Sequence, residues 1–223
     1  MSGGGPRYET FERSPPPEEL LLDARKERIE GVLARRTRTL VVVLDRLEDT
    51  FNMAAVLRTC EAFGVQEVHV VENEKVPFRP NPKVTQGCDK WLDVQRHRDF
   101  AACRAGLKAR GFALWASAVG EGAQSLYSLR FDQKVALIFG NERFGVSREV
   151  LDGCDGRFWL PMRGFTQSLN ISAAASACVS RAISWRVEHL GEAGDLSSEE
   201  KDALRERFHL LAVKQRGRIY GRS

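Results

Sequence analysis

The chain has 223 residues, of which 43% are hydrophobic and 29% charged, and its formal net charge is +4. These values are close to those of ordinary globular proteins, so they exclude a wholly disordered chain, and no apolar run reaches the length of a membrane-spanning helix. The first residues carry glycine, proline and charge where a secretory signal would be apolar, so we expect a cytoplasmic protein. The five cysteines and four histidines lack metal-ligand spacing, so we expect reduced cysteines and no bound metal.

The first expected element is a helix that lies outside the core. Residues up to about Ser14 are rich in glycine and charge and are predicted to be disordered. Prolines at positions 15 to 17 mark a helix start, and we expect a helix from about Glu18 to Arg36. Its apolar residues are compatible with one buried stripe, while its arginines can stay exposed.

From Leu40 onward, short β-branched or aromatic runs alternate with helical patterns. Strands are expected at residues 40–44, 67–71, 91–94, 112–117, 135–139 and 158–160. Helices are expected at residues 52–63, 99–110, 147–151 and 169–190, and a terminal helix is expected from Ser197 or Ser198 to about Val213. This alternation predicts an α/β fold with a mostly parallel sheet and helices on both of its faces.

Two polar, glycine-bearing turns directly follow expected strands. One is Gly140-Asn141-Glu142, and the other is Pro161-Met162-Arg163-Gly164. The carboxyl ends of parallel strands meet at one edge of a sheet, which is where open α/β folds bind ligands. The pair Gly120 and Gly122 does not make a dinucleotide-binding fingerprint, because Ser125 stands in place of the third glycine, and no Walker sequence occurs.

Basic residues gather toward both ends of the chain. The N-terminal group comprises Arg25, Lys26, Arg28, Arg35, Arg36 and Arg38, and the C-terminal group comprises Arg207, Lys214, Arg216, Arg218 and Arg222. Such clusters suit the phosphate backbone of a nucleic acid, although either cluster alone is also compatible with a solvated helix face. The presence of two clusters around one core favours a nucleic-acid partner.

Asn52 and Arg58 belong to the first expected helix of the core. They are six residues apart in the sequence, which is about 240° around an ideal helix, so they share a face only if Asn52 lies in the preceding turn. The plain alternative for Asn52 is a helix cap, and the plain alternative for Arg58 is a surface ion pair. Neither residue by itself decides a function.

Three segments taken together resemble a known enzyme family. They run from Asn52 to Gly64, from Phe139 to Val146 and from Leu160 to Ser172. Their order and spacing resemble the three motifs of the SPOUT-class (SpoU family) RNA 2′-O-methyltransferases, and the resemblance covers about residues 40–190. The short basic ends are similar to those of members that methylate guanosine 18 in the tRNA D-loop, whereas ribosomal-RNA relatives typically add a folded N-terminal domain.

The resemblance implies a fold, a cofactor and an assembly. In this family the C-terminal part of the core is tied in a deep trefoil knot, S-adenosylmethionine binds within the knotted loops, and the chain works as a homodimer. The implied division is a tail with a basic helical extension at 1–38, a knotted catalytic domain at 39–191, and a C-terminal basic helix and tail at 192–223. By position, the implied cofactor-binding residues are Ser117, Gly140, Asn141, Glu142, Leu160, Met162 and Leu169.

The resemblance also implies catalytic roles. Arg58 matches the arginine proposed to activate the ribose hydroxyl, and because a guanidinium stays protonated in proteins, we expect it to hold a phosphate and stabilise the developing alkoxide. Asn52 would orient Arg58 or the ribose, and Glu142, Ser168 and Asn170 would shape the cleft. The implied RNA-binding residues are Arg25, Lys26, Arg28, Arg35, Arg36, Arg38, Lys214, Arg216 and Arg218.

Two departures from the family pattern leave the substrate open. Phe51 stands where close tRNA-specific relatives often have histidine, and Arg163 occupies a normally apolar place. Ribosomal RNA or a different tRNA nucleotide is therefore the alternative substrate. A catalytically silent RNA-binding protein of the same fold is the alternative function.

Overall fold

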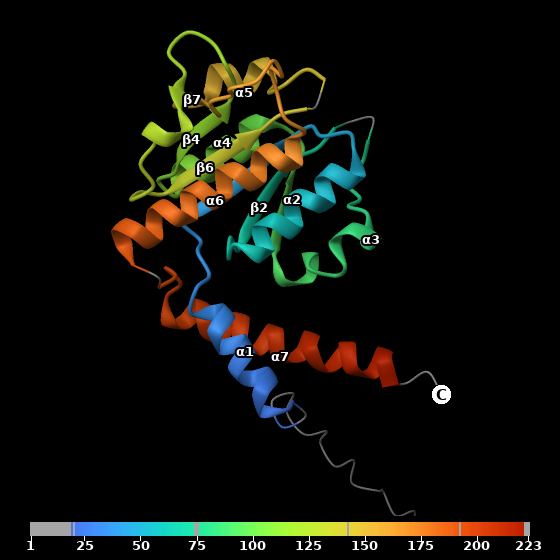
Figure 1. Ribbon diagram of the computed structural model, residues 1–223. Helices are drawn as coiled ribbons and strands as arrows, with labels where there is room; N and C mark the ends of the chain where they lie inside the picture. Colours follow the sequence, from blue (N-terminus) through green and yellow to red (C-terminus); the bar gives the residue numbers. More distant parts are fainter. Residues whose placement is uncertain (1–18, 20, 74–75, 142, 192, 221–223) are drawn as a thin grey trace, which may run out of the picture.

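The computed structural model describes residues 19, 21–73, 76–141, 143–191 and 193–220, arranged as in Figure 1. Within these residues, seven strands form one sheet, and every pairing between neighbouring strands is parallel. The predicted α/β fold with a parallel sheet is therefore confirmed. The predicted disorder of the first residues lies outside the described part of the chain.

The strands do not lie in the sheet in sequence order. Their order is β3-β2-β1-β6-β4-β7-β5, and their bounds are Leu40–Asp45 (β1), Glu67–Val71 (β2), Asp93–His97 (β3), Ala113–Ser117 (β4), Gln124–Ser125 (β5), Val135–Phe139 (β6) and Gly156–Trp159 (β7). The helices are Asp23–Leu33 (α1), Thr50–Ala62 (α2), Pro82–Thr85 (α3), Phe100–Ala109 (α4), Arg148–Gly153 (α5), Ile171–Leu190 (α6) and Ser198–Tyr220 (α7). Short 3₁₀ turns occur at Asp89–Trp91 and Leu126–Ser128.

Different helices cover the two faces of the sheet (Figure 1), as predicted. In β1, Leu40, Val42 and Leu44 belong to the core cluster shared with α2 and α6, whereas Val41 and Val43 belong to the cluster shared with α4 and α5. Side chains alternate between the faces of a strand, so a strand covered on both sides has to be apolar throughout. This explains why the apolar runs of β1 and β6 were recognisable in the sequence.

Several element boundaries differ from the predicted ones. α1 is shorter than the predicted helix, because residues 34–38 turn away to join β1, and α7 continues to Tyr220 instead of ending near Val213. The strand expected to begin at Trp91 begins at Asp93, since Asp93 is the residue that pairs with the first residue of β2. α3 and β5 have four and two residues, which is too short for a hydrophobic period to reveal them.

The C-terminal extension is tied to the core by a partly buried polar cluster. Arg186, in α6, donates hydrogen bonds to Thr37 and Thr39 and forms an ion pair of 3.2 Å with Asp195. The backbone N–H of Gly194 donates to the carbonyl of Ala34 over 2.7 Å. These contacts bring the segment before α7 beside the segment after α1, and the two helices then pack on each other through their own apolar cluster, apart from the sheet (Figure 1).

None of the described helices combines the length and the apolar composition needed to cross a bilayer.

Candidate functional site

The principal cleft lies at the carboxyl edge of the sheet and has a volume of about 680 Å³. Its walls come from the segments that follow β4, β6 and β7 and from the start of α6. Six of the residues implied as cofactor-binding line it, namely Ser117, Gly140, Asn141, Leu160, Met162 and Leu169. Glu142, the seventh, lies outside the described residues. Three sequence segments that are far apart in the chain thus converge on one concave site.

The turn after β6 depends on the absence of a side chain at Gly140. A Cβ built there would lie 2.1 Å from the backbone carbon of Gly145, far inside van der Waals contact. Asn141 and Gly145 exchange backbone hydrogen bonds of 2.8 Å, and the Asn141 side-chain oxygen accepts from the backbone N–H of Arg143 over 2.9 Å. This closure makes the cleft wall a tight hairpin-like turn.

Two polar residues at the carboxyl end of β1 hold this turn in place through hydrogen bonds. The carboxylate of Asp45, at the end of β1, accepts a hydrogen bond of 2.7 Å from the backbone N–H of Ser147, and burial raises the pKa of Asp45. The carbonyl of Arg46 accepts a hydrogen bond of 3.2 Å from the side-chain amide of Asn141. Neither residue is predicted from the sequence as part of the site. An acid that ends an otherwise apolar strand is the signal that points to Asp45.

Asn52 and Asn170 join α2 to the cleft. The side-chain amide of Asn170 donates to the side-chain oxygen of Asn52 over 3.0 Å, and Asn170 caps α6 by accepting from the backbone N–H of Ser172 over 2.9 Å. Asn52 itself is not a cap: Asp49 caps α2, so Asn52 lies in the first turn and is buried. The cap interpretation of Asn52 is therefore wrong. Ser168 lines the cleft, as Asn170 does.

Arg58 is exposed on α2 and is not among the residues that line the cleft. It has no ion pair or hydrogen bond with any side chain that the structure describes, so the surface ion-pair alternative finds no support there. The next residue, Thr59, shares a hydrogen bond of 2.7 Å with Ser176 of α6. The Asn52–Asn170 and Thr59–Ser176 contacts thus fix the helix to α6 and its cap on both sides of Arg58, while the guanidinium stays available to a ligand.

The basic residues near α1 divide into exposed and buried groups. Arg25, Arg28 and Arg35 are exposed. Arg36 is only 1% exposed, and its guanidinium donates to a Glu61 side-chain oxygen over 3.0 Å. The expectation that the arginines of this helix stay exposed is therefore wrong for Arg36, because the turn after α1 carries it inward under α7.

The remaining members of the two basic clusters are placed as follows. Arg38 is paired with Glu67 and Asp93, so it holds the edge of the sheet together. Lys26 is paired with Asp23 over 3.3 Å within α1. The side chains of Lys214, Arg216 and Arg218 lie outside the described part of the chain.

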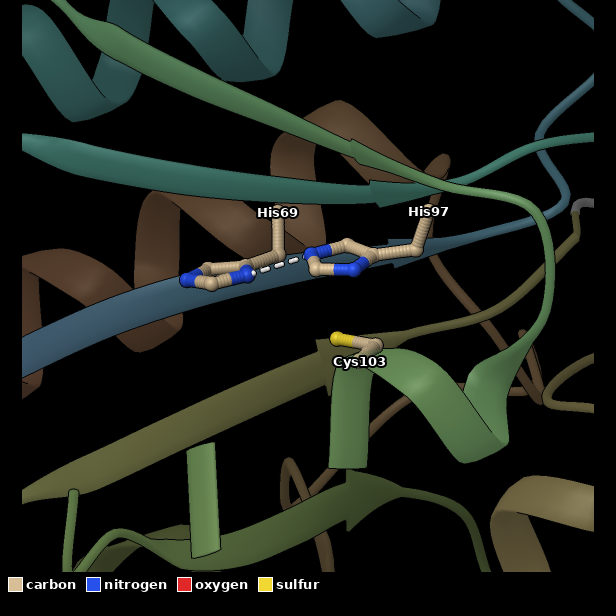
Figure 2. Close-up of side chains that lie close together, drawn as sticks. All are labelled: His69, His97 and Cys103. Carbon is tan, nitrogen blue, oxygen red and sulfur yellow. Dashed lines mark hydrogen bonds between the residues drawn. The ribbon is translucent and has the colours of Figure 1, made fainter. Parts of the chain in front are cut away.

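Two histidines that are remote in the sequence meet beside Cys103 (Figure 2). The ring nitrogens of His69 and His97 are 2.8 Å apart, the rings are within 10° of parallel, and their centroids are 5.1 Å apart. That centroid separation equals the N···N distance plus the radii of two imidazole rings, so the nitrogens point directly at each other. This is the geometry of an N–H···N hydrogen bond, and an ion between the rings would require them to separate.

The histidine pair extends a chain of polar contacts to Glu67. The other ring nitrogen of His69, Nε2, lies 2.7 Å from the Glu67 carboxylate, which also accepts hydrogen bonds from Arg110. Burial acts to raise the pKa of Glu67, but the hydrogen bonds from His69 and Arg110 outweigh it and hold the pKa at about 2. Burial lowers the pKa of His97, and the neighbouring His69 lowers it further. We interpret this cluster as structural. The scattered positions of the histidines in the sequence give no indication that two of them meet.

Residues 39–180 match the model of the SpoU rRNA Methylase family. A tRNA (guanosine(18)-2′-O)-methyltransferase of Thermus thermophilus is 37% identical over 166 residues, which are 74% of this chain and 85% of that protein.

Solved structures show the same relationship in three dimensions. The A. aeolicus TrmH/SpoU tRNA modifying enzyme superposes with a TM-score of 0.78 at 28% identity, covering 86% of this chain and 98% of that one. The SpoU methyltransferase AviRb from Streptomyces viridochromogenes, solved in complex with the cofactor AdoMet, superposes with a TM-score of 0.60 at 25% identity, covering 69% of this chain and 62% of that one.

Proposed function

The chain belongs to the SpoU rRNA methylase family, and we propose that it transfers a methyl group from S-adenosylmethionine to the ribose 2′-oxygen of guanosine 18 in the D-loop of tRNA. One observation carries this proposal: a cleft built from the family's motif segments is joined, through the Asn170–Asn52 hydrogen bond, to the helix that presents an exposed Arg58. Relatives that share most of this chain's length are named for that activity.

The cleft suits S-adenosylmethionine in size and in chemistry. Its volume of about 680 Å³ falls in the range of roughly 300–1,000 Å³ in which proteins bind ligands of this size. Leu160, Met162 and Leu169 supply apolar walls, and the turn around Gly140 brings backbone groups to the surface without an intervening side chain. When bound, the cofactor supplies an electrophilic methyl group on a sulfonium.

Arg58 is the residue that we assign to the chemistry of the acceptor. A 2′-hydroxyl is a weak acid, and a protonated guanidinium is a poor base, so Arg58 would hold a neighbouring phosphate and stabilise the negative charge that develops on the ribose oxygen. Such preorganised electrostatic help is worth about 3 kcal/mol. The proton would pass from the 2′-oxygen to that phosphate or to water.

The two asparagines and Ser168 would position the reactants. Because Asn170 holds Asn52 and also caps α6, a displacement of either side chain would move the cleft rim relative to α2. Ser168 is exposed at the rim, where its hydroxyl would contact the ribose. Glu142 keeps the role implied by the resemblance, which is to shape the cleft.

The remaining features of the proposal concern architecture. We propose the trefoil knot in the C-terminal part of the core, supported by a strand order in which β7 lies between β4 and β5 although it follows β6 in sequence. A homodimer is proposed because Arg58 lies outside the lining of its own cleft and because Phe51, two turns earlier in α2, is 59% exposed. We also propose that the chain divides into an N-terminal extension, a catalytic domain and a C-terminal extension, with boundaries at residues 38/39 and 191/192. The proposed location is the cytoplasm, where tRNA is found.

Calorimetry followed by nucleoside mass spectrometry tests the reaction class. The purified protein is titrated with S-adenosylmethionine and then incubated with unmodified tRNA or ribosomal RNA. We expect cofactor binding, and 2′-O-methylguanosine in the tRNA alone. Methylation of ribosomal RNA instead would correct the substrate, and cofactor binding without any ribose methylation would support the silent RNA-binding alternative.

A further inference from the structure

A second cavity, of about 180 Å³, lies where α1 and α7 meet the core. Three arginines line it, Arg25, Arg28 and Arg36, together with Glu61. Trp91 and Phe208 supply its aromatic wall. None of these residues lines the cleft at the carboxyl edge of the sheet, so the two sites are distinct.

The charges of this cavity are only partly neutralised. Glu61 pairs with Arg36, but the Nε of Arg36 is buried and has no hydrogen-bond partner among the described residues. Arg25 and Arg28 are exposed one helical turn apart, and neither forms an ion pair with a described residue. Three positive groups against one carboxylate make the cavity a site for an anion.

Aromatic rings give the site a preference among anions. The ring of Trp91 packs edge-on against Phe208 with the centroids 5.0 Å apart, and the Nζ of Lys90 lies 4.7 Å from the Trp91 centroid. A guanidinium cluster beside a partly exposed tryptophan offers one surface for a phosphate and another for a planar base, which is how nucleotides of single-stranded RNA are held. Free inorganic anions would use the first surface only.

The position of the cavity separates it from the reacting ribose. Arg36 precedes β1 and Trp91 precedes β3, whereas the cleft lies beyond the opposite ends of the strands. Strands of five residues at about 3.3 Å each place the two sites roughly 17 Å apart. A nucleotide in this cavity would therefore not be the methylated one.

We propose that the cavity between α1, α7 and Trp91 binds one nucleotide of the tRNA substrate away from the methylated ribose, with its phosphate on Arg25 and Arg28 and its base against Trp91. This inference rests on the proposed function, since it takes tRNA as the partner. Within the N-terminal basic group, the proposal assigns the contribution to tRNA binding to Arg25 and Arg28.

Filter binding of an unmodified tRNA transcript, without cofactor, tests the proposal with a charge-matched control on α5. Arg148 has the same charge as Arg25 and Arg28, but it is paired with Asp152 over 2.9 Å, does not line the cavity and belongs to neither basic group. We expect Arg25→Ala and Arg28→Ala each to weaken binding about five- to tenfold and Arg148→Ala by less than about twofold. Equal losses in all three variants would overturn the proposal, because they would indicate a diffuse electrostatic surface.

Ultraviolet crosslinking of the wild-type complex provides an independent readout that does not depend on a variant's folding. The peptide that contains Trp91 is expected to carry a nucleotide adduct, and an excess of free guanosine monophosphate, which carries the same phosphate and a planar base, should reduce that adduct. Adducts confined to other peptides would contradict the inference. Wild-type protein that binds tRNA in this way but transfers no methyl group would instead overturn the proposed function alone.

Discussion

The side-chain amide of Asn170 donates a 3.0 Å hydrogen bond to the side-chain oxygen of Asn52, 118 residues earlier in the chain. Asn170 simultaneously caps α6. One residue therefore fixes both the start of the helix that borders the cleft and the position of the helix that carries Arg58, which couples the geometry of the cofactor cleft to that of the acceptor side.

Asn170→Ser should separate these two roles. Serine is also a good helix cap, but its side chain is too short to reach Asn52. We therefore expect the melting temperature to change little while the methylation rate falls at least about tenfold. Asn170→Ala, which removes the cap as well, should lose a further ~1 kcal/mol of stability. Full activity of Asn170→Ser would show that the contact with Asn52 has no catalytic importance.

Arg58→Lys tests the assignment of the guanidinium. A lysine keeps the charge but loses the planar fork that can hold a phosphate with two hydrogen bonds. Calorimetry should show unchanged affinity for S-adenosylmethionine, and single-turnover assays should show a methylation rate at least about a hundredfold lower. Arg148→Lys, on the exposed face of α5, is the control and should behave as wild type. A normal rate for Arg58→Lys would remove this residue from the chemistry.

Gly140→Ala should abolish cofactor binding. The added Cβ would lie 2.1 Å from the backbone of Gly145, so the turn that forms the cleft wall has to open. Gly164→Ala is the matched control in a neighbouring loop, because a Cβ there meets no atom within 4 Å. The two variants are compared by calorimetric titration with S-adenosylmethionine. Similar affinities would show that the turn does not contact the cofactor.

The lowered pKa of His97 makes stability depend on pH. The folded state lowers the pKa of His97, so the unfolded chain binds more protons in the acid range, and the stabilising contribution present above the unfolded pKa of about 6.5 is lost as the pH falls. Urea unfolding at pH 7.5 and 5.5 should show this loss, and His97→Gln, which does not titrate, should reduce it. Glu67, whose pKa is about 2, should add a second loss between about pH 4.5 and 2.

An unchanged pH dependence in His97→Gln would locate the titration elsewhere. Asp45 would not be the source of that loss, because burial raises its pKa. It would produce the opposite trend, with stability gained as the pH falls.

Gly194→Ala should loosen the C-terminal extension. A Cβ at this position would lie 2.1 Å from the carbonyl oxygen of Arg36, so the segment before α7 has to move away from the core. Limited proteolysis should then cut before α7 faster than in wild type, and tRNA binding should weaken. Gly106→Ala, in α4 where a Cβ meets nothing within 4 Å, should leave the cleavage rate unchanged. Equal cleavage in both variants would mean that the close approach is not needed.

The sequence predicted the parts of this molecule that depend on local pattern. The apolar run Val135–Phe139 became a strand with the expected bounds, and the motif turns around Gly140 and Met162 met at one sheet edge because parallel strands place them there. The features that the sequence did not predict depend on contacts between residues that are distant in the sequence. Burial of Arg36 requires Glu61 and α7, and the meeting of His69 and His97 requires the register between β2 and β3. No local signal carries such information.

The proposed transfer to a 2′-oxygen is tested most directly with two tRNA transcripts that differ only at guanosine 18, one carrying ribose and the other 2′-deoxyribose at that position. Each is incubated with the protein and S-adenosylmethionine labelled in its methyl group, and the labelled nucleotide is mapped. The account predicts label on guanosine 18 of the first transcript and none on the second. Equal labelling of both would contradict it.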